Sequence, residues 1–105
     1  YSHLLGECGV SFFGVEKLAS PLQSNFPHSL DEAPMLLPMA MSSSRGMLDQ
    51  WFERIGIRPI IIGEFDDNAL LKVFGQAGEG IFAAPTVIEK EVELQYQVQV
   101  VERTN

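Results

Sequence analysis

The stretch that decides the fold runs from Arg58 to Pro85 and reads RPIIIGEFDDNALLKVFGQAGEGIFAAP. Its first part, Pro59 to Phe65, predicts a strand whose three consecutive isoleucines suggest burial on both faces. Asp66 or Asp67 can cap a helix that follows with apolar residues at helical spacing and ends at a glycine. Gly80 to Ala84 then predicts another short strand. Strand, helix and strand in this order indicate an α/β protein with a parallel sheet.

The same alternation continues on both sides of this stretch. Apolar patterns predict strands at Glu7 to Phe13, Met35 to Met39 and Tyr96 to Val101, and helices at Val15 to Leu22, from Ser42-Ser43-Ser44 to Ile55, and at Val87 to Leu94. Thr86 with Glu89 three residues later matches a capping box for the last helix. The sequence therefore predicts an α/β fold in three layers, with a mostly parallel, Rossmann-like central sheet and right-handed crossovers.

Composition excludes several classes of protein. The chain has 105 residues, 46% of them hydrophobic, which fits one small globular domain. Seven Lys and Arg against fourteen Asp and Glu give a formal charge of −7, which argues against binding of a phosphate backbone by this segment. A single Cys excludes an internal disulfide and a multi-cysteine zinc site. The apolar runs are too short to span a bilayer, so we expect no membrane partner.

No pattern predicts an enzyme. The glycine-rich segment from Gly75 to Gly80 follows a helix and precedes a strand, the reverse of a dinucleotide-binding loop. Cys8 has only His3 and His28 as candidate bases, and a buried core thiol is the more ordinary role for such a residue. We therefore expect a binding or sensing domain.

Ser42, Ser43, Ser44 and Arg45 form the first candidate binding segment, because they stand where a strand gives way to a helix. In open α/β sheets, ligands settle outside the carboxyl ends of strands, near helix N-termini whose free N–H groups favour anions. Three hydroxyls and a guanidinium there suit a small polar or carboxylate ligand. The alternative is a serine-rich helix cap beside a solvated arginine.

Glu64, Phe65, Asp66, Asp67 and Asn68 form the second candidate segment, at the next junction of strand and helix. Three carboxylates and an amide supply the hard oxygen ligands that small cations prefer. The alternative is that one or two of these acids cap the helix and interact with its dipole.

Four blocks of sequence resemble the effector-binding domain of LysR-type transcriptional regulators: Gly6 to Phe13, Leu48 to Phe52 with Gly56, Gly63 to Gly75, and Ile81 to Thr86. The resemblance implies the two-lobed fold of type 2 periplasmic binding proteins. Residues 1–105 would be the second lobe, with 1–13 and 96–105 as hinge or crossover strands toward a first lobe. Because the chain begins at Tyr1, we expect it to be a piece of a longer protein.

The resemblance also implies a function: an effector-sensing regulatory lobe of a cytoplasmic activator. Such regulators self-associate as dimers or tetramers through these domains and contact promoter DNA through a separate helix-turn-helix. By resemblance, Ser42 to Arg45, Phe65 and Asn68 contribute to the effector cleft. The amino-acid sequence from Gly63 to Gly75 is similar to that of an activator of sodium/proton antiporter genes, which implies a response to sodium and pH.

A monovalent cation, sodium or lithium, is accordingly the expected effector, and no other cofactor is expected. Glu64, Asp66 and Asp67 are its hypothetical ligands, because they concentrate oxygen donors at one junction. The alternative function is that of a lobe from a periplasmic-type solute-binding protein, which has the same architecture.

Overall fold

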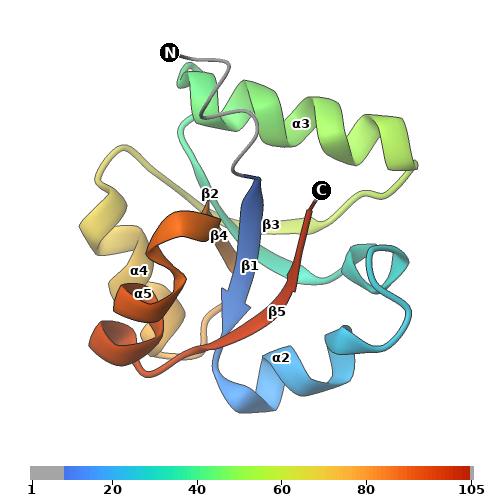
Figure 1. Cartoon of the computed structure of the whole chain (residues 1–105). Coiled ribbons are helices and arrows are strands. Elements are labelled where there is room, and N and C mark those ends of the chain that lie inside the picture. The colour runs from blue at the N-terminus through green and yellow to red at the C-terminus, as the bar shows by residue number, and fades with distance from the viewer. Residues whose placement is uncertain (1–8, 105) are drawn as a thin grey trace.

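The computed structural model describes residues 9–104 (Figure 1). Within them, none of the helices combines the length and apolar character needed to cross a bilayer. The predicted first strand begins at Val10, and its residues Glu7 and Cys8 lie outside the described part of the chain. The elements in order are β1 (Val10–Gly14), α2 (Glu16–Gln23), the 3-10 turn η1 (His28–Leu30), β2 (Pro34–Pro38), α3 (Ser43–Ile55), β3 (Ile60–Phe65), α4 (Asn68–Gln76), β4 (Phe82–Pro85), the 3-10 turn η2 (Thr86–Ile88), α5 (Glu89–Tyr96) and β5 (Gln99–Arg103).

The alternation of strands and helices is confirmed, but the sheet is mixed rather than mostly parallel. β2 and β3 pair in parallel, and a parallel bridge from Met35 to Ile81 brings β2 beside the start of β4. β1, in contrast, runs antiparallel to both β4 and β5. The prediction of parallel pairing was wrong for β1, since β4 and β5 flank it from distant parts of the sequence and run against it.

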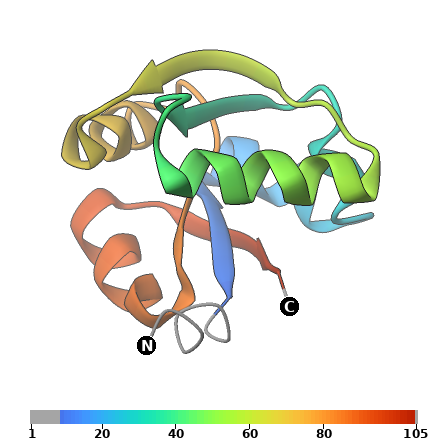
Figure 2. The same ribbon diagram turned by 90° about the horizontal axis from the view of Figure 1, so that it is seen from above.

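Two hydrophobic cores lie on opposite faces of the strands, which gives the three layers that were predicted. Phe12 belongs to a cluster with residues of α2 and α3, whereas its neighbour Phe13 belongs to a cluster with residues of α4 and α5. Both phenylalanines are fully buried, and because side chains alternate along a strand they lie on opposite faces of β1. Figure 2 shows α4 and α5 gathered on the same side of the molecule.

β3 departs from its prediction. Ile60, Ile61 and Ile62 were expected to be buried on both faces, yet they are 52%, 46% and 50% exposed. In the described part of the chain β3 pairs only with β2, so it is an edge strand with one open side. The expectation was wrong because apolar residues in a strand do not show whether the rest of the same lobe covers them.

Helix ends agree well with the sequence signals in α3 and α4. The Ser42 hydroxyl accepts from the Arg45 N–H at the start of α3, and Gly56 ends that helix with a left-handed φ of 84°. The Asp67 carboxylate accepts from the Ala69 N–H at 2.9 Å, which makes it the cap of α4.

Gly75 allows α4 to pack directly on β4. A Cβ at this position would lie 2.4 Å from two ring atoms of Phe82, which is fully buried. We expect Gly75→Ala to destabilise the fold by about 1–3 kcal/mol, because the helix must move away from the ring. Gly46→Ala is the matched control: it lies in α3 with nothing within 4 Å, and should stabilise by about 0.5–1 kcal/mol. Urea unfolding of both variants measures the difference, and equal effects would contradict the close packing.

Candidate functional site

A cleft of about 560 Å³ lies where the ends of the central strands meet the first turns of two helices. β2 and β4 end at this edge and β1 begins there, because β1 runs against β4. Its lining combines the strand ends with α3 and the first turns of α4, and comprises Gly9, Val10, Pro38, Ser43, Ser44, Met47, Leu48, Gln50, Trp51, Arg54, Asn68, Leu71, Lys72, Ala83, Ala84, Pro85, Val87 and Thr104.

Three of the predicted effector-binding residues line this cleft. Ser43 and Ser44 are the first residues of α3, and Asn68 is the first residue of α4. Their hydroxyl and amide groups therefore lie at the first turns of the two helices. Both predicted junctions therefore contribute residues to the cleft, and their role in binding an effector stays a prediction. Ser42, their neighbour, is used as the cap of α3 instead.

Arg45 is buried away from the cleft by three hydrogen bonds. Its Nη1 donates to Glu64 Oε2 at 2.7 Å and to the Pro38 carbonyl at 3.0 Å, and its Nε donates to Asp49 Oδ1 at 3.0 Å. The bond to Glu64 raises the pKa of Arg45 against the opposing effect of burial. The guanidinium thus joins the end of β2 to α3 and β3, and it does not line the cleft.

The three predicted cation ligands do not come together. Glu64 pairs with Arg45, Asp67 caps α4, and Asp66 is exposed to solvent. Within residues 9–104, no group of three His, Cys, Asp or Glu side chains lies close enough to hold a metal ion. The geometry therefore gives no support to a site built from these carboxylates, and a cation at this junction stays a prediction.

Phe65 packs against Phe74 of α4, with ring centroids 5.1 Å apart, and it does not line the cleft. The sequence had instead missed Lys72 and Arg54, which contribute the charges of the cleft. No carboxylate lines the cleft in the described residues, so its charged groups are positive. Lys72 could have been found from its spacing, because it lies four residues after Asn68 on the same face of α4.

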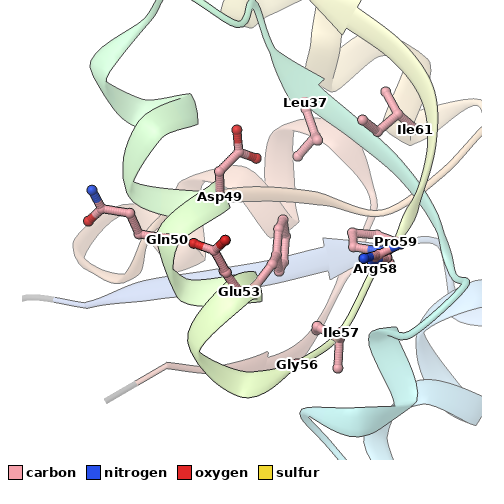
Figure 3. Close-up of a pocket in the computed structure, with 10 residues that line it drawn as sticks. Leu37, Asp49, Gln50, Glu53, Gly56, Ile57, Arg58, Pro59 and Ile61 are labelled. Carbon is pink, nitrogen blue, oxygen red and sulfur yellow. The ribbon is translucent and has the colours of Figure 1, made fainter.

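A second groove of about 630 Å³ lies between α3 and the chain leading into β3 (Figure 3). Asp49 and Glu53 point into it from α3, and Arg58 lies across from them. Its apolar surface comes from Leu37, Phe52, Ile57, Pro59 and Ile61.

Thr86 and Glu89 do not form the predicted capping box. Neither side chain caps a helix: the Thr86 hydroxyl lies 2.9 Å from the Ser11 hydroxyl, and the Glu89 carboxylate accepts from Arg103. The prediction was wrong because Thr86 is the first residue of a short 3-10 turn and Ile88 takes the N-cap position of α5.

Similarity to known proteins is strong in sequence over most of the chain. The chain is 41% identical over 87 residues to the transcriptional activator protein NhaR of Escherichia coli (strain K12), and equally to that of Shigella flexneri. The match covers 83% of this chain but only 28% of the relative, so the chain spans less than a third of the protein that it matches. No protein-family model matches.

Solved structures share the fold at low identity. The regulatory domain of Synechocystis PCC6803 CcmR, in complex with 2-PG, has a TM-score of 0.72 at 14% identity and covers 89% of this chain and 45% of its own. The effector-binding domain of AmpR from Citrobacter freundii has a TM-score of 0.61 at 18% identity, and the match covers 93% of this chain and 49% of the AmpR chain. A periplasmic binding protein from Brucella ovis with glutathione bound has a TM-score of 0.60 at 11% identity, and the match covers 90% of this chain and 31% of the binding protein.

The fold is therefore that of a lobe from the type 2 periplasmic binding protein class, as the sequence predicted. Within this class, the chain resembles NhaR in sequence over 87 residues, and it shares its fold with the regulatory domain of CcmR and the effector-binding domain of AmpR.

Replacing Arg45 tests its structural role. We expect Arg45→Lys to destabilise the chain by about 1–2 kcal/mol, because an ammonium keeps the charge but cannot reach the same three acceptors. Arg54→Lys, an exposed position on the same helix, should change stability by less than about 0.5 kcal/mol. Urea unfolding of both variants gives the comparison, and an equally small effect of Arg45→Lys would contradict a role in joining these elements.

Proposed function

We propose that this chain is the effector-sensing lobe of a cytoplasmic LysR-type activator that controls sodium/proton antiporter genes. The observation that carries the proposal is the cleft, where Ser43, Ser44 and Asn68 meet in a lobe with 41% identity to a transcriptional activator. That identity favours a regulator over the alternative of a solute-binding protein. Promoter DNA would be contacted by a helix-turn-helix domain outside this segment.

The mechanism is a shift between arrangements of two lobes. An effector that contacts the cleft of one arrangement better than that of the other changes their populations by its difference in affinity. About 45–49% of the two LysR-type neighbours' chains is matched, which fits one lobe of a two-lobed domain. The change in lobe arrangement would then alter how the assembled regulator holds DNA.

Sodium or lithium is the proposed effector, and the structure offers two places with different chemistry. Ser43, Ser44 and Asn68 present neutral oxygens at the cleft, although the positive charges of Lys72 and Arg54 line the same cleft and oppose a cation. The carboxylates of Asp66 and Asp67 lie outside the cleft. We place the effector in the cleft, because lobe closure can act only on a ligand that both lobes touch.

Reporter transcription driven by the intact regulator, titrated with sodium, distinguishes the two places. Asn68→Ala and the double variant Ser43→Ala/Ser44→Ala should raise the sodium concentration for half-maximal induction about tenfold, equivalent to about 1.4 kcal/mol. Asp66→Asn/Asp67→Asn should leave induction unchanged, because asparagine still caps α4. Ser20→Ala, an exposed position on α2, is the control. Loss of induction only in the aspartate variant would contradict the cleft assignment.

Self-association is part of the proposal, and the groove between α3 and β3 is its proposed surface. Half-exposed Ile61 lines the groove on an edge strand, which is the kind of apolar surface that proteins usually cover. Asp49 and Glu53 face Arg58 across the groove, so one face carries both signs of charge. A second protomer can therefore match it in both apolar character and charge, and we propose that protomer as the occupant.

Ile61→Lys tests this surface, since it places a charge in the groove without disturbing a buried residue. In sedimentation of the intact regulator across micromolar concentrations, we expect at least tenfold weaker association. Leu94→Lys on α5 is the control, because Leu94 is 82% exposed and lies outside the groove. Unchanged association of Ile61→Lys would exclude the groove as the interface.

A further inference from the structure

One carboxylate, that of Glu89 at the start of α5, is bonded to two strands that lie side by side. Arg103 on β5 donates from Nε to Oε2 at 2.6 Å and from Nη2 to Oε1 at 2.7 Å, which makes a bidentate ion pair. Ser11 on β1 donates its hydroxyl to Oε2, and its Oγ also lies 2.9 Å from the Thr86 hydroxyl. We call Ser11, Thr86, Glu89 and Arg103 the hinge cluster.

The hinge cluster is partly withdrawn from water. Ser11 is fully buried, and the side chain of Glu89 is 12% exposed against 53% for Arg103. A carboxylate removed from water needs charged or hydrogen-bonding partners to remain ionised, and here it has them. Hydrogen bonds from Arg103 lower the pKa of Glu89 against the effect of burial, with a smaller contribution from Ser11. The ion pair therefore persists at neutral pH.

The position of the cluster is at the ends of β1 and β5. Ser11 lies opposite Arg103 in the ladder of these two strands, and the ladder shifts its register after one further pair, between Phe12 and Phe13. Regular backbone pairing is therefore interrupted beside the cluster, and side chains help to hold the two strands in place. The Thr86 N–H also donates to the Gly9 carbonyl at 3.3 Å, which joins the end of β4 to the start of β1.

We propose that the hinge cluster is a conformational clamp: Glu89 fixes β1, β5 and the start of α5 in one arrangement and so sets how this lobe turns relative to the other lobe. The proposal rests on the proposed function and on the expectation that residues 1–13 and 96–105 lead toward the first lobe. In that arrangement, a rotation between the lobes would pass through β1 and β5. A bond network that crosses both strands opposes their sliding past each other.

Two variants of the intact regulator test the clamp. Glu89→Gln keeps the shape of the side chain and loses its charge, and Arg103→Gln removes the two-pronged donor. Glu91→Gln is the control, because it removes a carboxylate from an exposed position of the same helix. Energy transfer between a dye at Lys17→Cys on α2 and a dye in the other lobe, in a background without other cysteines, reports the distance between lobes.

The expected result is a broader interlobe distance distribution in Glu89→Gln and Arg103→Gln than in Glu91→Gln, at temperatures well below their unfolding midpoints. The ratio of induced to uninduced transcription should fall about fivefold or more, the lower range of coupling between sites. Lowered thermal stability with an unchanged distance distribution would overturn the clamp, since it would show a structural role alone. If the unmodified regulator shows no sodium response, the proposed effector is wrong, and the distance measurement still decides on the clamp.

Discussion

Burial of two consecutive phenylalanines on opposite faces of β1 is the constraint on which the rest of the structure depends. Phe12 and Phe13 are both fully buried, so β1 must be covered by helices on both faces and by strands on both edges. α2 and α3 contribute to one core, and α4 and α5 to the other. The same strand begins at the cleft, so the element that organises the core also positions one edge of the candidate site.

Local signals predicted most elements because their causes are local. A serine cap, a left-handed glycine and an aspartate cap decide where α3 and α4 begin or end. The direction of β1 was not predictable in this way, because it depends on pairing with strands more than 60 residues away in sequence. The exposure of Ile61 was missed for a related reason: apolar residues read alike whether they belong in a core or on a surface that another chain covers.

The sequence pointed to two junctions that contribute to the cleft, but not to the charged residues that line it. Ser43, Ser44 and Asn68 line the cleft because strand ends and helix starts meet at one edge of the sheet. Arg45 and Glu64 were each predicted to contact an effector, yet Arg45 on α3 forms an ion pair with Glu64 on β3. Nothing in their separate sequence contexts shows this, because the tertiary packing of the helix and the strand brings them together. The same limitation applies to Glu89 and Arg103.

The close pairing between the start of β1 and the residue after β5 brings the two ends of the folded lobe together. Val10 and Thr104 exchange backbone and side-chain hydrogen bonds at 2.8–3.1 Å, and a Cβ on Gly9 would lie only 3.0 Å from the Thr104 carbonyl. The two ends of this 95-residue folded unit are thus as close as neighbours in a ladder, about 5 Å apart. A host protein can accept such a unit at a single surface position with little change to its own backbone. With its two ends side by side, the lobe has the geometry of a domain that can be inserted into another protein as a unit.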